Sequence, residues 1–296
     1  MTVATRPCHF ARYYENAPSR TEADGTCHWA SRGANFLVVV TRAAPGAVLE
    51  REDNADEYML LLPEDVPARI EASSETVESA GDSLTILPPG PSRITLQAGG
   101  YAYRIFTSKA KDLLPLADNA KDYAAGVGDV APMVPWPDPV GGYRIRHYRL
   151  ADYTREGTSL RLFRSTNLMV NVFVPQAKAR DTSKMTPHSH ADFEQGSLTL
   201  SGSFVHHLRY PWTPDLKAWR EDEHGRMDSP SLVVITPNVI HTTQTVTTGQ
   251  PIRLVDIFSP PRVDFSLKPG WINNADEYPM PPAVAEQAAQ GAAVAA

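Results

Sequence analysis

Short runs of apolar and largely β-branched residues recur along most of the chain, each bounded by glycine, proline, serine or asparagine. Within many of these runs, apolar and polar residues alternate, which is typical of strands with one buried face. The pattern therefore predicts a chain built mainly of short strands. The predicted strands occupy residues 35–42, 57–63, 83–89, 103–108, 143–150, 159–165, 167–175, 197–202, 203–210, 231–237 and 252–260.

Helical periodicity is scarce in this sequence. The best helical segment, residues 109–126, is interrupted by Pro115, and residues 127–142 are rich in proline and read as an extended linker. Residues 279–296 are rich in proline and alanine and are expected to form a mobile tail. We therefore predict an all-β protein with few short helices, made of a barrel over residues 1–126, the linker, and a second barrel over residues 143–278.

Composition narrows the functional classes. The chain has 296 residues, 42% of them hydrophobic, and a net charge of −6 without a basic stripe, so a nucleic-acid partner is not expected. Its apolar runs are too short to cross a membrane. The two cysteines, Cys8 and Cys27, are expected to be reduced thiols in a cytoplasm rather than a disulfide framework. Exposed edge strands need covering, so a homodimer is expected.

The strongest chemical signal is a cluster of metal-ligand residue types. His188, His190 and Glu194 share one parity, so on an extended strand they point to the same face. His241 follows a predicted strand and turn and is the natural fourth ligand. Three imidazoles and a carboxylate suit Fe(II), Mn(II), Ni(II), Co(II), Cu(II) or Zn(II), and affinity does not choose among them.

These residues resemble the motifs of the cupin superfamily. His188, His190, Glu194 and Gly202 resemble the first motif, although the glycine falls one residue late. Residues 236–241 resemble the second motif, with threonine in place of its proline and asparagine in place of its glycine. Asparagine tolerates a left-handed turn better than other non-glycine residues. The resemblance implies a jelly-roll or double-stranded β-helix barrel holding one divalent transition metal, Fe(II) being favoured, in the second half of the chain.

The first half can be laid over the second, as in a bicupin. Glu57 then falls where Glu194 does, Arg51 and Asp53 fall where the two histidines do, and Arg93 falls where His241 does. Because arginine does not ligate metals, the first barrel is expected to have lost its metal site. The arginines and acids of this half are expected to form an internal ion-pair cluster.

Further residues are candidates for contact with a substrate. Glu194 is expected to act as ligand, general base or both, and His206 is a candidate catalytic acid or base on a predicted strand. Asp192 and Gln195 are candidate hydrogen-bond partners of the ligand histidines. Inward-facing arginines would bind a carboxylate or phosphate; the candidates are Arg144, Arg146, Arg161 and Arg164. Residues 211–228 are expected to cap the barrel, form a dimer interface or serve as a surface loop.

Three functions are consistent with this site, because one fold supports many chemistries. The favoured hypothesis is a mononuclear metal dioxygenase acting on a small enolisable or aromatic compound. The alternative is a redox-neutral isomerase, lyase or decarboxylase acting on a polar acid or sugar. A non-catalytic ligand-binding cupin is the third hypothesis.

Overall fold

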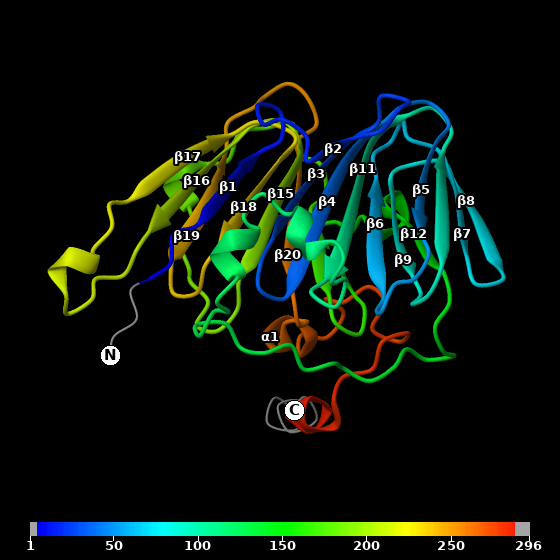
Figure 1. The fold of residues 1–296 in the computed structure, drawn as a ribbon. Helices are drawn as coiled ribbons and strands as arrows, with labels where there is room; N and C mark the ends of the chain where they lie inside the picture. The colour runs from blue at the N-terminus through cyan, green and yellow to red at the C-terminus, as the bar shows by residue number, and fades with distance from the viewer. Residues whose placement is uncertain (1–4, 288–296) are drawn as a thin grey trace.

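Two barrels lie side by side in the computed structural model, which describes residues 5–287 (Figure 1). Each barrel consists of two antiparallel sheets, and the helical elements of the described residues are short. The predicted all-β class with two barrels and few short helices is confirmed.

The N-terminal barrel contains a seven-stranded and a four-stranded sheet. The larger sheet has the order β12 (Arg146–Arg149), β9 (Ser83–Leu87), β6 (Tyr58–Leu62), β11 (Gly100–Thr107), β4 (Phe36–Ala43), β3 (Cys27–Arg32) and β2 (Arg20–Thr21). The smaller sheet has the order β5 (Ala47–Arg51), β10 (Ser92–Leu96), β7 (Ala68–Ala72) and β8 (Glu75–Ser79). Two 3-10 helices follow, η1 (Leu114–Leu116) and η2 (Ala120–Tyr123).

The C-terminal barrel contains a six-stranded and a three-stranded sheet. The larger sheet has the order β1 (His9–Arg12), β18 (Ser231–Ile235), β15 (Gln195–Ser201), β20 (Arg253–Phe258), β14 (Met169–Val172) and β13 (Leu162–Arg164). The smaller sheet has the order β17 (Glu223–Met227), β16 (Phe204–Arg209) and β19 (Ile240–Thr245). The short helices of this part of the chain are η3 (Leu150–Tyr153), η4 (Thr182–Lys184), η5 (Leu216–Ala218) and, after the last strand, α1 (Val263–Ser266).

Each barrel includes one strand from the other half of the sequence. β1 pairs with β18 of the C-terminal barrel, and β12 pairs with β9 of the N-terminal barrel. The boundaries drawn from the sequence, 1–126 and 143–278, put β1 in the N-terminal barrel and β12 in the C-terminal barrel. A run of alternating residues identifies a strand but carries no information about the sheet that it joins. The predicted linker, residues 127–142, forms no strand or helix.

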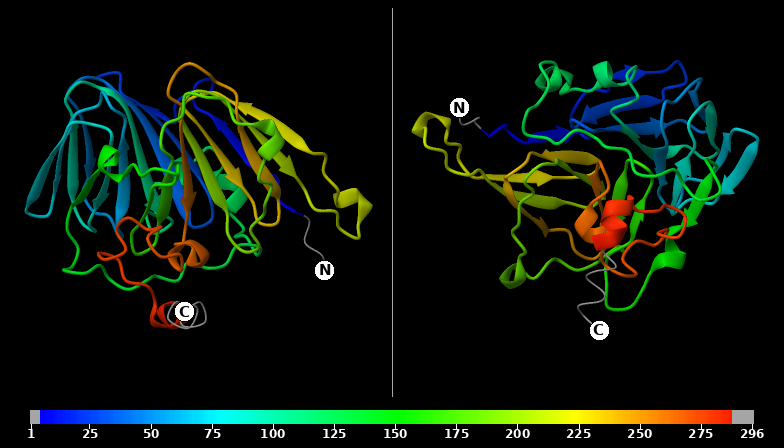
Figure 2. Two further views of the ribbon diagram at one scale, coloured as in Figure 1. Left: turned by 180° about the vertical axis from the view of Figure 1, so that it is seen from behind. Right: turned by 90° about the horizontal axis from the view of Figure 1, so that it is seen from below.

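The larger sheets of the two barrels pack against each other. Val38, Met59 and Ile105 from one sheet belong to the same buried cluster as Leu198 and Ile257 from the other. Fully burying such a side chain contributes about 1.5–3 kcal/mol. The apolar face between the barrels therefore holds them in a fixed arrangement, visible from behind and from below in Figure 2.

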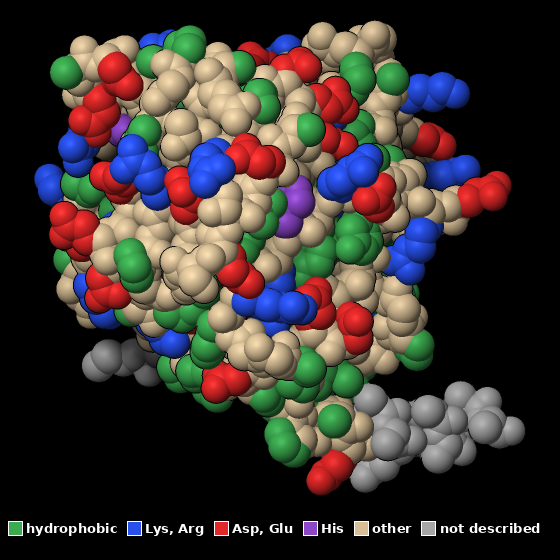
Figure 3. Space-filling view, turned by 90° about the vertical axis from the view of Figure 1, so that its right-hand side faces the viewer, with side chains coloured by type: hydrophobic (Ala, Val, Ile, Leu, Met, Phe, Trp, Pro, Cys, Tyr) green, Lys and Arg blue, Asp and Glu red, His purple; other side chains and the backbone are tan. Residues whose placement is uncertain are grey.

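The surface outside this interface is mixed in character. On the face seen in Figure 3, acidic and basic side chains are interspersed, in keeping with the lack of a basic stripe in the sequence. None of the helices within residues 5–287 has both the length and the hydrophobicity needed to cross a membrane. Part of the predicted mobile tail, residues 288–296, lies outside the described residues, and residues 282–287 are helical.

Candidate metal centre

Three of the four predicted ligands come together in the C-terminal barrel. One ligand atom each from His188, His190 and His241 lies within 4.8 Å of the others. His188 and His241 face each other across two backbone hydrogen bonds, of 3.1 and 2.8 Å, which hold their rings side by side. The ring centroids are 4.4 Å apart. His188 and His241, more than 50 positions apart in the sequence, converge because β19 and the segment before β15 pair at this point.

The turn before His241 has the geometry that its sequence indicates. Asn238 adopts a left-handed backbone conformation with φ 66°. Asparagine can therefore replace the glycine of the motif, because it tolerates this conformation better than most residues. Its N–H donates a 2.6 Å hydrogen bond to the carbonyl oxygen of His190. The turn therefore connects the two histidine-bearing segments directly.

The histidine rings have the state that metal ligands need. Nδ1 of His188 lies 2.9 Å from the carbonyl oxygen of Thr186, and Nδ1 of His241 lies 3.0 Å from that of Val239. A proton on each Nδ1 would satisfy these contacts and leave Nε2 free to ligate. Burial lowers the pKa of His190 to about 4 and that of His241 to about 3, so both rings are neutral at neutral pH. The three residues fit a divalent transition metal.

Glu194, predicted to act as ligand, general base or both, lies elsewhere. Its carboxylate accepts hydrogen bonds from Arg6 Nη2 at 2.6 Å, the Ala34 N–H at 2.6 Å and the Tyr123 hydroxyl at 3.0 Å. All three donors come from the first half of the chain. The prediction expected a short bend to bring Glu194 to the histidines, but the bend at residues 191–192 turns it away, and β15 begins only at Gln195. The shared parity is therefore lost before Glu194.

Glu57 has the matching role in the other barrel. It is 1% exposed and accepts hydrogen bonds from the Thr166 N–H and hydroxyl and from the Tyr278 hydroxyl. Each of these two glutamates thus accepts hydrogen bonds from a backbone N–H and a tyrosine contributed by the other half of the molecule. The alignment of Glu57 with Glu194 is structurally correct, but both residues connect the barrels.

The predicted internal ion-pair cluster of the first barrel does not form. Arg51 pairs with Asp112 at 2.6 Å, and Arg93 pairs with Glu50 at the surface. Neither arginine contacts Asp53 or Glu57 in an ion pair within residues 5–287. Their strands lead each side chain to a different neighbour, which the alignment of the two halves did not reveal.

Gln195 takes the place beside the histidines that the sequence assigned to Glu194. Its Oε1 lies 3.0 Å from Nε2 of His190 and 3.4 Å from Nε2 of His241. Its Nε2 donates a 3.1 Å hydrogen bond to Asp256. As the first residue of β15, it points into the barrel together with Ser197, whose hydroxyl also donates to Asp256. Counting the alternation backwards from this strand would have identified it.

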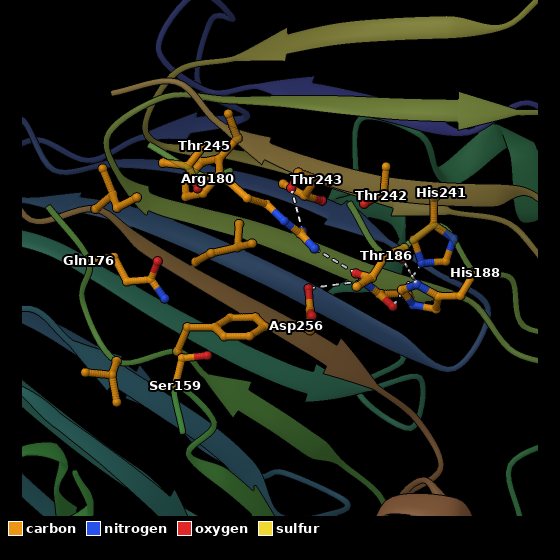
Figure 4. Close-up of a pocket in the computed structure, with 16 residues that line it drawn as sticks. Ser159, Gln176, Arg180, Thr186, His188, His241, Thr242, Thr243, Thr245 and Asp256 are labelled. Atoms are coloured by element: carbon orange, nitrogen blue, oxygen red, sulfur yellow. Dashed lines mark hydrogen bonds between the residues drawn. The ribbon is translucent and has the colours of Figure 1, made fainter. Parts of the chain in front are cut away.

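His188 and His241 open into a cavity of about 390 Å³ inside the barrel (Figure 4). Asp256 and Arg180 lie on this cavity with His188 and His241. Burial raises the pKa of Asp256 to about 7. Arg180 donates to the carbonyl oxygen of Thr243 at 2.9 Å and to the Thr186 hydroxyl at 2.8 Å, and within residues 5–287 it forms no ion pair. The sequence interpretation missed both residues. Arg180 stands in a loop without strand character, and Asp256 was read only as part of the predicted strand 252–260.

The other sequence candidates do not line this cavity. His206 is 1% exposed and lies behind Thr243, whose hydroxyl is 3.1 Å from its Nδ1, and burial lowers its pKa to about 3. The four candidate arginines bind other groups. Arg144 and Arg146 pair with Glu277, Arg161 donates to backbone carbonyls, and Arg164 donates to the carbonyl oxygen of Tyr278.

The lining itself is divided between polar and apolar side chains. Its polar members beyond the histidines include Ser159, Gln176, Thr186 and Thr245, and its apolar members are Phe173, Val174, Phe204, Ile252 and Leu254. A small organic molecule with a charged and an apolar part would match both surfaces.

Residues 5–287 thus form two barrels of two sheets each, and one histidine cluster lies among them. The protein is a double-barrel β-protein with one candidate metal centre in these residues. No family model matches the sequence, and no curated protein matches it. Solved structures do match. An oxalate decarboxylase from Lactobacillus farciminis, in a formate complex, has 13% identity and a TM-score of 0.58, with 86% of each chain covered.

Two further neighbours support the same fold. Oxalate decarboxylase from Bacillus subtilis has 12% identity and a TM-score of 0.57, covering 91% of this chain and 83% of its own. AerE from Microcystis aeruginosa has 9% identity and a TM-score of 0.51, covering 80% and 93%. The chain has the cupin fold, duplicated as a bicupin.

Proposed function

We propose that this chain is a metal-dependent cupin enzyme that binds a small organic acid in the C-terminal barrel and carries out redox-neutral chemistry on it. Decarboxylation, isomerisation and lyase reactions belong to this class. The observation that carries the proposal is the position of Arg180, a guanidinium without an ion-pair partner among the described residues, on the same cavity as His188 and His241, two of the three clustered histidines.

His188, His190 and His241 would hold one divalent transition metal. A metal bound there would supply Lewis acidity to an oxygen atom of the substrate. The structurally similar oxalate decarboxylase from Bacillus subtilis has Mn(II) centres. We propose a divalent ion of the Fe(II) or Mn(II) kind, since imidazole and oxygen donors suit both.

The chain's own residues provide binding and proton transfer. The Arg180 guanidinium would bind the substrate carboxylate, because its planar fork matches two carboxylate oxygens. Asp256 would hold or release a proton beside the bound molecule. Gln195 is a positioning residue, because its amide connects Asp256 to His190. Phe173 and Phe204 would exclude water from the apolar part of the cavity.

A dioxygenase acting on an enolisable or aromatic compound is the second candidate. The apolar lining formed by Phe173, Val174, Phe204, Ile252 and Leu254 favours it, since this surface would pack against a planar ring. The two candidates share the metal and the cavity. They differ in whether dioxygen is consumed.

One experiment separates these functions. Purified protein is analysed for metal by mass spectrometry and then mixed with short dicarboxylates and with catechols or diketones, while an oxygen electrode records uptake. Product formation from a dicarboxylate without oxygen uptake supports the main proposal, and Arg180→Met should then raise KM at least tenfold. Oxygen uptake with a catechol or diketone would support the dioxygenase. A protein that binds no metal after supplementation would contradict both.

The cellular location and the assembly are also proposals. Cys8 and Cys27 are free and buried, in keeping with a cytoplasmic protein. The connection between β16 and β17 carries Trp212, 76% exposed and stacked on Trp219 with ring centroids 4.4 Å apart. We propose that a homodimer covers this surface. Light scattering on Trp212→Ser should then report a monomer, whereas an unchanged mass would exclude the surface as an interface.

A further inference from the structure

The N-terminal barrel carries two arginines at places where the C-terminal barrel has site residues. Arg104 pairs with Leu60 of β6 in the same way that Asp256 pairs with Ser197 of β15. On the other side of these strands, Tyr58 pairs with Leu87 of β9 in the same way that Gln195 pairs with Ile235 of β18. Arg104 therefore corresponds to Asp256, and Tyr58 corresponds to Gln195.

Arg51 and Ser92 complete this correspondence. They face each other across β5 and β10, as His188 and His241 face each other in the C-terminal barrel. Ser92, rather than Arg93, thus stands at the position of His241. The hydroxyl of Tyr58 is 2.7 Å from that of Ser92, a contact resembling that between Gln195 and His241. The interior of the first barrel therefore has the same layout as the site, with arginines at two of these four positions.

Arg104 is buried without a partner. It lies on the same face of β11 as Ala102 and Phe106, which belong to the N-terminal barrel's own core, so its side chain points inward. The residue is 8% exposed. Its Nε is buried with no hydrogen-bond partner, and no residue between 5 and 287 forms an ion pair or hydrogen bond with its guanidinium. A charged group in this setting normally has a partner, because burying it alone is costly.

A second guanidinium lies close to it. The Cζ atoms of Arg51 and Arg104 are 5.5 and 5.8 Å from the centroid of the Phe106 ring. Arg51 bonds Asp112 through its terminal nitrogens, but its Nε is buried and has no partner. Two donors without acceptors thus lie near one aromatic ring, beside the paired hydroxyls of Tyr58 and Ser92.

Burial does not remove this charge. The pKa of Arg104 falls only to about 10, chiefly through burial, so the side chain stays protonated at neutral pH. Arg51 and Ser92 also line a groove at the surface of the barrel. Its acidic residues are Glu50, Glu52 and Glu71; Glu50 pairs with Arg93 and Glu71 with Arg69, while Glu52 has no ion-pair partner within residues 5–287.

We propose that the N-terminal barrel binds a small oxyanion between Arg104 and Arg51, entering through the groove at Ser92. The ligand is a carboxylate or a phosphate, since the guanidinium of Arg104 can bind either through paired N–H donors, and Arg51 adds its free Nε–H. The two hydroxyls supply further donors. The bicupin would then have a metal centre in one barrel and an anion site in the other.

The test measures thermal stability in the Arg180→Met background, which removes the arginine of the C-terminal cavity. Inorganic phosphate and malonate are each compared with sodium chloride at equal ionic strength. At a concentration 100-fold above Kd, an anion that binds only the folded chain should raise Tm by about 5 °C. Arg104→Met should abolish this rise without lowering Tm in anion-free buffer, because it removes an unpaired buried charge.

Two further variants make the result specific. Arg93→Met removes an exposed arginine of the same groove and should keep the full rise. Arg51→Met should weaken it, and this variant decides the question if Arg104→Met does not fold. A response to only one of the two anions identifies the source of the oxyanion. The proposal is overturned if neither anion raises Tm beyond chloride, or if the rise persists in Arg104→Met or is undiminished in Arg51→Met.

Discussion

Replacing Glu194 with alanine should destabilise the protein and leave metal binding intact. The buried carboxylate accepts hydrogen bonds from Arg6, Ala34 and Tyr123. In the variant, Arg6 keeps its 2.9 Å contact with Asp129, while the Ala34 N–H and the Tyr123 hydroxyl lose their acceptor. Each buried group left unsatisfied costs about 1–3 kcal/mol. Together with the broken ion pair, the free energy of unfolding should fall by about 3–5 kcal/mol.

The assay combines differential scanning calorimetry with metal analysis of the same sample. A loss of this size corresponds to a fall in Tm of about 6–10 °C for a chain of this length. Glu57→Ala, which removes the matching carboxylate, should show a similar fall, and Glu221→Ala, at an exposed position, should change stability by under about 0.5 kcal/mol. A Glu194→Ala protein that keeps its Tm but loses its metal would refute the reasoning and restore Glu194 as a ligand.

Three other substitutions test separate parts of the structure. His188→Ala should abolish metal binding in mass spectrometry and cost under about 1 kcal/mol, because the ring is exposed, whereas His224→Ala should retain the metal. Asp256→Asn should keep the metal while kcat falls about 10²–10⁴-fold; an unchanged kcat would remove Asp256 from proton transfer. Gly225→Ala places a Cβ 2.2 Å from the Phe10 ring and should cost about 1–3 kcal/mol in urea unfolding, with Gly128→Ala as the near-neutral control.

Much of the fold could be predicted because alternation and turn residues are local signals. The strands around residues 36–43, 58–62, 83–87 and 231–235 were predicted almost at their observed bounds. β1 was not, because His9–Arg12 has no run of apolar residues and gains its pairing only from β18. Its contribution depends on a long-range contact, which a single sequence does not display.

The site was partly predictable for the same reason. The three histidines stood out because their residue type and spacing are rare. Glu194 was misplaced because strand parity does not pass through a bend, and Gln195 inherits the inward direction. Arg180 and Asp256 gave no local signal. Their relation to the histidines comes from tertiary packing, which places a loop and β20 on one cavity.

The exchange of β1 and β12 has a consequence for how the chain is made. During synthesis, the first barrel cannot complete its larger sheet until residues 146–149 have left the ribosome, and β1 has no partner until residues 231–235 follow. The earliest strand of the chain must therefore wait for most of the second half. A fragment limited to residues 1–126 would lack β12, and one limited to residues 143–278 would lack β1, so neither barrel is a continuous, self-contained segment of the chain.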